Sequence, residues 1–188
     1  MEENRKKVYI YTDGGCSGNP GAGAYASILT YTDNTGKLHE KILTDGFKTT
    51  TNNRMEILAA VVGLEALKVP ADVVLTSDSK YLIDAIEKKW IDGWQKRNWK
   101  TADKSPVKNV DLWRRLLEAM KPHNVKFEWV KGHNGHDYNE KCDEIVKNTF
   151  KRDDLKVDEN YINSLDANIQ KTKNTGANDE QRFLFKEQ

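Results

Sequence analysis

Two hydrophobic segments that each end in an aspartate constrain the fold of this chain most. Residues 8–12 (VYIYT) are rich in β-branched and aromatic side chains, which is typical of a strand, and Asp13 follows them. Residues 73–77 (VVLTS) repeat the pattern and are followed by Asp78. If the two strands lie side by side and parallel, both carboxylates reach the carboxyl edge of one sheet, where open α/β folds place their sites. This pattern indicates a site for a metal ion.

The residues after Asp13 carry little side-chain bulk. Five glycines and Pro20 fall within residues 14–23, which we interpret as a loop with room for a bulky, charged group. Glycine-rich loops also hold nucleotides, but this one has no GxxxxGK[ST] and lacks the third glycine of a dinucleotide loop. A nucleotide-binding loop is therefore not favoured.

The rest of the chain alternates strand and helix patterns. The first three strands form a meander, with a turn at residues 33–36 between the second and the third. The order βββαβααβα predicts an α/β fold with a mixed sheet and helices on its faces. The expected strands are residues 8–12, 24–32, 38–47, 72–77 and 125–130, and the expected helices are residues 54–68, 79–89, 110–120 and 138–150.

The 188 residues allow one domain with an appendage. We expect a folded domain over residues 1–150 and a mostly flexible extension over residues 151–188, because residues 151–180 are largely polar. One short helix is expected around residues 158–170. The last residues turn apolar again at residues 183–185.

Charge is distributed unevenly along the chain. The net charge is only +1, but residues 88–121, called the basic segment below, carry ten Lys or Arg against four acids. The same segment holds four of the five tryptophans. Of these, Trp113 lies on an apolar helix face, which predicts a core position, and the fifth, Trp129, is placed in the core by the period of the strand at residues 125–130. Basic and aromatic side chains together are typical of nucleic-acid binding, whereas the bland interpretation is a solvated helix whose tryptophans fill the core.

Cysteine usage and hydropathy indicate where the protein works. Cys16 and Cys142 lack the spacing of a redox or zinc motif, which favours a reducing compartment. Neither a signal peptide nor an apolar run long enough to cross a membrane is evident. We expect a cytoplasmic protein that does not bind a membrane.

Five motifs in register resemble type 1 ribonuclease H in its bacterial form. They are DGGCSGNPG at 13–21, TTNNRMEILA at 50–59, TSDSKYL at 76–82, the basic protrusion at 93–113 and KGHNGHDYNEKCDE at 131–144. The resemblance implies a ribonuclease H-like five-stranded mixed sheet in the order 3-2-1-4-5, with helices on both faces. It also implies a monomeric endoribonuclease that hydrolyses the RNA strand of RNA/DNA hybrids and leaves 5′-phosphate and 3′-hydroxyl ends.

The resemblance further implies a metal-dependent reaction. Two Mg²⁺ ions roughly 4 Å apart would activate a water and stabilise the leaving oxygen, with Mn²⁺ as a substitute. The residue types agree, because Mg²⁺ prefers hard oxygen ligands and crowded carboxylates repel one another without a cation. Taken singly, each acid could equally be a turn, cap or surface residue. The implied ligands, which are also the implied catalytic acids, are Asp13, Glu56, Asp78 and Asp143.

Further positions are implied to assist the reaction or to bind the hybrid. His133, in a Gly-flanked loop, would assist proton transfer or product departure. Lys80 stands where related bacterial enzymes often have Gln, so it could bind a phosphate instead of a base edge. The asparagines could instead cap helices or form turns. The implied substrate contacts are Cys16, Asn19, Thr51, Asn52, Asn53, Lys80 and Asn109, together with Trp90, Lys96, Arg97, Lys100 and Lys108 of the basic segment.

The C-terminal residues suggest a partner. Gln181, Leu184 and Phe185 form a Q-x-x-L-F pattern, which resembles the pentapeptides by which bacterial replication proteins dock on the sliding clamp. The alternative is that these side chains pack on the folded domain or have no partner. A rival of another class, a hybrid-binding module without catalysis, would tolerate the loss of an acid, yet all four acids are present.

Overall fold

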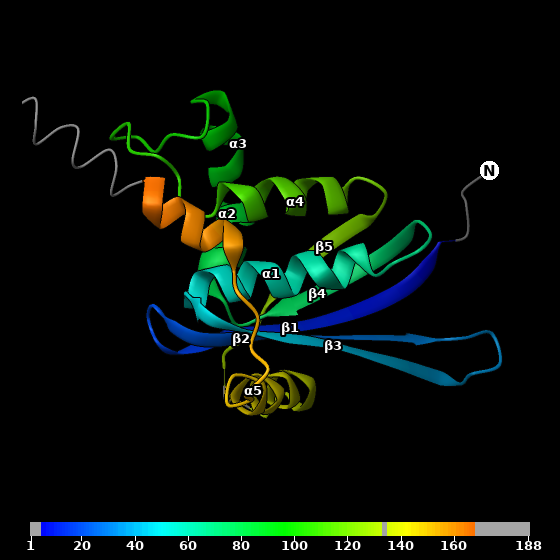
Figure 1. The fold of residues 1–188 in the computed structure, drawn as a ribbon. Coiled ribbons are helices and arrows are strands. Elements are labelled where there is room, and N and C mark those ends of the chain that lie inside the picture. Colours follow the sequence, from blue (N-terminus) through cyan, green and yellow to red (C-terminus); the bar gives the residue numbers. More distant parts are fainter. Residues whose placement is uncertain (1–4, 133–134, 168–188) are drawn as a thin grey trace, which may run out of the picture. The chain divides into compact units, whose positions relative to one another are not determined.

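The computed structural model describes residues 5–132 and 135–167 (Figure 1). The chain divides into two compact units, of which the first ends at Val157 and the second starts at Asp158. Within the described part of the second unit, residues 159–167 are helical, and the Asp158 carboxylate accepts a hydrogen bond from the Tyr161 N–H at 3.2 Å. None of the described helices is both long enough and apolar enough to span a membrane.

One five-stranded mixed sheet forms the centre of the first unit. Its order is β3-β2-β1-β4-β5, which is the predicted order. Strands β1, β2 and β3 are antiparallel neighbours, whereas β4 lies parallel to both β1 and β5. The strands are β1 (Lys6–Gly18), β2 (Gly21–Thr32), β3 (Leu38–Thr50), β4 (Ala71–Ser77) and β5 (Asn124–Trp129).

Helices cover both faces of this sheet. Helix α5 lies alone on one face, and the other four lie on the opposite side (Figure 1). The prediction missed the short helix α3 within the basic segment, because its seven residues are too few to show a helical period and include Gly93. The helices are α1 (Asn52–Glu65), α2 (Lys80–Glu87), α3 (Trp90–Lys96), α4 (Val110–Met120) and α5 (Asp137–Thr149).

The glycine-rich stretch after Asp13 is not a loop, and that prediction was wrong. Strand β1 continues through the glycines to Gly18 and pairs residue by residue with β2, whose Gly21 lies opposite Gly18. The glycines are required by packing: a Cβ at Gly23 would lie 2.6 Å from the Thr50 side chain and 2.8 Å from that of Cys16. The stretch is therefore a close-packed hairpin that reaches beyond the body of the sheet.

Helix α1 is the central helix of the core. Its Met55, Ile57 and Val61 are fully buried, and Gly63 brings it against β1 and β2, because a Cβ there would lie 2.4 Å from the Ser27 hydroxyl. Trp113 of α4 is also fully buried, as its helical position predicts. Together with the apolar face of the sheet, these side chains form one continuous core.

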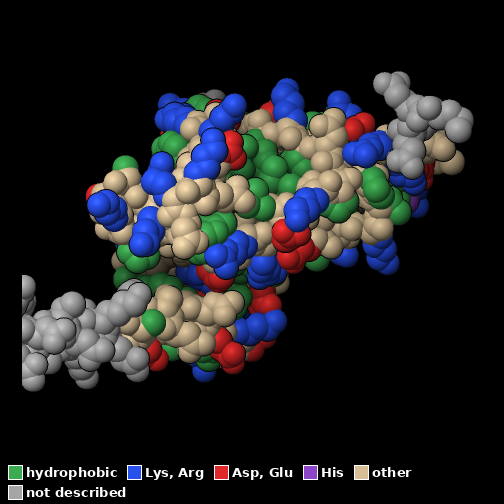
Figure 2. Space-filling model, turned by 90° about the horizontal axis from the view of Figure 1, so that it is seen from above, with side chains coloured by type: hydrophobic (Ala, Val, Ile, Leu, Met, Phe, Trp, Pro, Cys, Tyr) green, Lys and Arg blue, Asp and Glu red, His purple; other side chains and the backbone are tan. Residues whose placement is uncertain are grey.

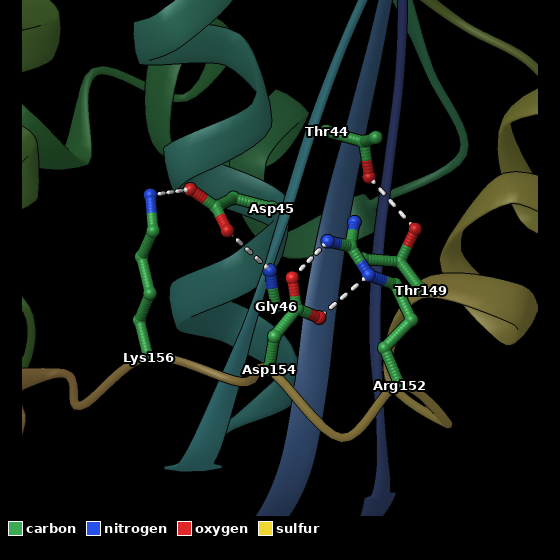
Figure 3. A network of polar contacts seen from close by, with 7 residues as sticks. All are labelled: Thr44, Asp45, Gly46, Thr149, Arg152, Asp154 and Lys156. Carbon is green, nitrogen blue, oxygen red and sulfur yellow. Dashed lines mark hydrogen bonds and ion pairs between the residues drawn. The ribbon is translucent and has the colours of Figure 1, made fainter.

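Residues 149–156, called the strap below, fasten the chain after α5 to the edge strand β3 (Figure 3). The Lys156 N–H donates to the Gly46 carbonyl at 2.9 Å, and the Lys156 carbonyl accepts from the Lys48 N–H at 2.8 Å. At the start of the strap the Thr149 hydroxyl lies 3.0 Å from that of Thr44. The first unit therefore extends beyond residue 150, where the sequence suggested that the extension begins. The strap also occupies hydrogen-bonding groups that an edge strand would otherwise expose.

We predict that the strap depends on its backbone pairing more than on its ion pairs. Lys156→Pro removes the N–H that bonds Gly46 and should lower the free energy of unfolding by about 1–3 kcal/mol. Lys156→Ala removes only the exposed ion pair with Asp45 and should cost less than about 1 kcal/mol. Urea unfolding of both variants measures the difference. Equal losses would show that the backbone pairing contributes nothing.

Candidate active site

Four carboxylates, from β1, α1, α5 and the loop after β4, lie near one another where the parallel pairing of β1 and β4 ends. Thr12 of β1 and Ser77 of β4 are the last pair of the parallel ladder. Asp13 and Asp78 directly follow these two residues and therefore lie next to each other. Glu56 lies in the second turn of α1, and Asp143 lies on α5 across the sheet. The two aspartates that end hydrophobic segments are thus brought together in the way that the sequence predicts.

A close approach of α1 to β1 places Glu56 at this edge. A Cβ at Gly14 would lie 2.3 Å from the backbone nitrogen of Glu56 and 2.3 Å from the carbonyl carbon of Met55. Only glycine at this position lets the helix backbone rest directly on the strand. Gly14 therefore sets the distance at which Glu56 faces Asp13.

The electrostatics show that these carboxylates act on one another. Burial, followed by repulsion from Asp78 and then from Asp143 and Glu56, raises the pKa of Asp13 to about 7. Burial and repulsion from Asp78 also raise the pKa of Glu56 to about 7, against the opposing hydrogen bond from Ser79. Repulsion of this kind requires that the groups share one poorly solvated region. The site is thus a concentrated negative charge that favours a cation.

Sequence reasoning missed the residues that hold the carboxylates in place. The Ser79 hydroxyl donates to Glu56 Oε2 and accepts from the Leu82 N–H at 3.2 Å, so that one side chain caps α2 and orients an acid. The Asn139 amide donates to Asp78 Oδ2 at 3.3 Å. Lys147, one turn along α5, donates to Asp143 Oδ2 at 2.5 Å. Ser79 starts the helix expected over residues 79–89, where a serine is typical of an N-cap, but its bond to Glu56 depends on the fold.

The donor set fits Mg²⁺. All four candidate ligands offer carboxylate oxygens, which are hard donors, and a cation among them would offset the repulsion that they carry. Among residues 5–132 and 135–167, no group of three or more His, Cys, Asp or Glu side chains is arranged so that it could hold a metal ion by itself. Mg²⁺ retains several waters and accepts substrate phosphates, so that an open group of carboxylates suits it better than it suits Zn²⁺.

Comparisons with known proteins agree with this geometry. The RNase H family model matches residues 5–151. Ribonuclease H of Proteus mirabilis (strain HI4320) is 54% identical over 159 residues, which cover 85% of this chain and 96% of that protein. The chain belongs to the RNase H family. The resemblance seen in the sequence is confirmed, and with it the enzyme class, a nuclease.

Solved structures share the fold of this RNase H. LC9-RNase H1, described as a type 1 RNase H with the type 2 active-site motif, matches with a TM-score of 0.71 at 27% identity, over 79% of this chain and 74% of that one. LC11-RNase H1 in complex with RNA/DNA hybrid matches with a TM-score of 0.56 at 22% identity, over 77% and 96% of the two chains. The ribonuclease H-like architecture that the sequence predicts is thereby confirmed.

Three of the expected substrate contacts in this RNase H are linked by hydrogen bonds beside the acids. The Asn52 side-chain oxygen accepts from the Cys16 N–H at 2.8 Å and lies 3.2 Å from the Cys16 sulfur. The Asn19 side-chain oxygen in turn accepts from the Asn52 N–H at 3.3 Å. These bonds fasten the glycine-rich hairpin to the start of α1.

Asn109, another expected substrate contact, is held by the buried side chain of Arg54, whose role the sequence did not indicate. Arg54 donates to both carboxylate oxygens of Asp111, at 3.0 and 2.9 Å, and to the Asn109 side-chain oxygen at 3.3 Å. This bidentate pair ties α1 to α4. Thr51 precedes α1 at its N-cap position without a side-chain cap bond, and Asn53 is exposed on its first turn.

The basic segment places its charges on the surface. Figure 2 shows Lys and Arg side chains gathered over the region of α3 and the residues that follow it. Trp94, by contrast, is 9% exposed and packs in the core, and it lies 6.2 Å from the ring of the partly buried Trp90. The core interpretation thus holds for Trp94. The implied basic contacts are all exposed: Lys96, Arg97, Lys100 and Lys108.

The expected role of His133 and the expected burial of Trp129 remain to be compared with the structure. His133 lies outside the described residues, so its role stays a prediction. Trp129, which the strand period places in the core, is instead 41% exposed, and that prediction was wrong. It shares a face of β5 with Phe127, which is 8% exposed, but it is the last residue of the strand.

We call the carboxylates of Asp13, Glu56, Asp78 and Asp143 the acid cluster. We predict that the acid cluster makes the stability of the metal-free protein depend on pH. Because folding raises the pKa values of Asp13 and Glu56 to about 7, the folded protein keeps protons that the unfolded chain loses near pH 4. The stability that these groups contribute is therefore largest below about pH 4 and falls as the pH rises to about 7. Asp13→Asn should flatten this dependence and raise Tm at pH 8.

Calorimetry in EDTA between pH 4 and pH 8 measures this effect. Asp84→Asn is the matched control, because Asp84 lies on α2 and pairs with the exposed Lys88 at 2.8 Å. The electrostatic interpretation is contradicted if Asp13→Asn follows the same pH profile as the control.

Proposed function

We propose that this RNase H is an endonuclease that hydrolyses the RNA strand of RNA/DNA hybrids and leaves 5′-phosphate and 3′-hydroxyl ends. The observation that carries the proposal is the convergence of Asp13, Glu56, Asp78 and Asp143 beside a set of small polar groups. The family membership supports the activity, and the hybrid bound by LC11-RNase H1 supports the substrate.

In this proposal the four carboxylates hold two Mg²⁺ ions, with Mn²⁺ as a substitute. When bound, the metal supplies an activated water and stabilises the departing oxygen. Ser79 and Asn139 keep the carboxylates of Glu56 and Asp78 turned toward the site. His133 would accept or donate a proton near the attacking water.

The arrangement of polar groups supports a proposal for how the two strands would be told apart. A hybrid offers a wide, shallow minor groove with 2′-hydroxyls on one strand only. The hairpin and the start of α1 bring backbone and small side chains close enough to reach those hydroxyls through Cys16, Asn19, Asn52 and Asn53. Thr51 and Asn109 would bind a DNA-strand phosphate. The exposed charges of the basic segment, with Trp90, would hold the DNA strand further along.

We predict that cleavage is specific for hybrids, dependent on metal and lost on neutralising one ligand. Gel analysis of a labelled RNA/DNA hybrid, with single-stranded RNA, duplex RNA and duplex DNA as controls, tests this. Asp13→Asn should lower the cleavage rate in Mg²⁺ by at least about 10²-fold, because it removes a charged ligand. Asp84→Asn should retain wild-type activity. Tight hybrid binding without cleavage in Mg²⁺ or Mn²⁺ would favour the binding-module alternative.

We further propose that the protein works as a cytoplasmic monomer that docks on the sliding clamp. The supporting pattern, Gln181 with Leu184 and Phe185, lies outside the described residues. A pull-down of clamp by the full chain should succeed, and the double variant Leu184→Ala with Phe185→Ala should reduce it at least about tenfold by removing the apolar anchors. Equal recovery of clamp by both proteins would rule out this contact.

A further inference from the structure

The exposed indole of Trp129 is attached directly to the backbone of a candidate metal ligand. Its N–H donates to the Asp78 carbonyl oxygen at 3.1 Å, and the N–H of the next residue, Val130, donates to the Ser77 carbonyl at 3.1 Å. The ring is therefore fixed at the carboxyl edge of the sheet while 41% of its surface faces solvent. An indole held at this place presents an aromatic face next to Asp78.

Lys80 covers that face. Its ammonium nitrogen lies 4.0 Å from the centroid of the Trp129 ring, whereas Lys6, Lys7 and Lys88 lie 5.3 to 5.7 Å from the rings that they approach. A cation at this distance is attracted by the negative face of the indole. The described residues include no carboxylate within 4.0 Å of this ammonium group, so the ring is its partner there.

The Trp129 ring provides the Lys80 ammonium group with a partner other than the nearby carboxylates. Lys80 follows Asp78 by two residues, and a flexible ammonium group so close to a buried acid cluster is drawn toward the carboxylates. Bound to the indole, the ammonium group is held by the ring instead of by those carboxylates. It also remains accessible, because Lys80 is an exposed residue at the start of α2.

We propose that Lys80 and Trp129 act together as a phosphate contact for the strand that is cut. Lys80 Nζ would bind a phosphate of the RNA strand next to the one held by the acid cluster, and Trp129 is the positioning residue that presents the ammonium group. This inference rests on the proposed function, because the acid cluster defines which strand lies beside Asp78. A compact ammonium group suits a phosphate better than it suits a base edge.

Steady-state cleavage of a hybrid at several KCl concentrations tests the proposal. Lys80→Gln should raise KM about three- to tenfold with kcat changed less than about twofold, and the slope of log KM against log salt should fall by about 0.9, the value for one phosphate contact. Lys126→Gln is the matched control: it removes an exposed lysine of β5 that pairs with Glu128, and it should leave both KM and slope unchanged.

Variants of Trp129 separate positioning from a general structural effect. Trp129→Leu removes the aromatic face and should raise KM as Lys80→Gln does, and the double variant should be no worse than either single one. Trp129→Phe keeps an aromatic face but loses the hydrogen bond to Asp78, and it should lower the salt slope by less than half of the decrease of about 0.9 expected for Lys80→Gln. Tm of each variant identifies loss of folding.

The failure of this inference is distinct from failure of the proposed function. An unchanged salt slope in Lys80→Gln, or an equal decrease in Lys126→Gln, would overturn the phosphate contact while hybrid cleavage persists. Additive effects of Lys80→Gln and Trp129→Leu would overturn the joint action. Absence of hybrid cleavage by the wild-type protein would instead refute the proposed function itself.

Discussion

The direct contact of the α1 backbone with β1 at Gly14 is the constraint on which the site depends. Any side chain there would overlap the peptide between Met55 and Glu56. The contact brings a helix that is buried over most of its length onto the strand that carries Asp13, so the core and the acid cluster share one packing arrangement. A change that moved α1 would therefore alter both stability and the distance between two candidate ligands.

The acid cluster destabilises the folded state in the absence of a cation, and the rest of the structure must hold it in place. Burial and mutual repulsion raise the pKa values of Asp13 and Glu56, and the apolar core must offset that cost in the absence of a cation. Ser79 and Asn139 hold the carboxylates in place from the edges of the site. The same unfavourable arrangement is what would make cation binding favourable. Stability and function are thus opposed at this edge of the sheet.

Much of the fold could be predicted from local pattern. Strand and helix periods predicted all five strands and four of the helices, and the two segments ending in Asp13 and Asp78 predicted the carboxyl edge. The errors have a common cause. Glycines after Asp13 suggested a loop because sequence shows their freedom but not the neighbours that exclude a Cβ. Trp129 has the period of a core residue, but it is the last residue of its strand and remains 41% exposed.

The sequence by itself determined which chemistry is available: hard oxygen donors at strand ends, small polar groups beside them and a basic segment, together with motifs that indicate one family. Only the tertiary structure decided which of these groups meet. Arg54 joins Asp111 across 57 residues of sequence, and Lys80 rests on Trp129, because strand pairing and helix packing bring distant segments together. Local pattern records the period and polarity of a segment, whereas such contacts depend on the register of its neighbours.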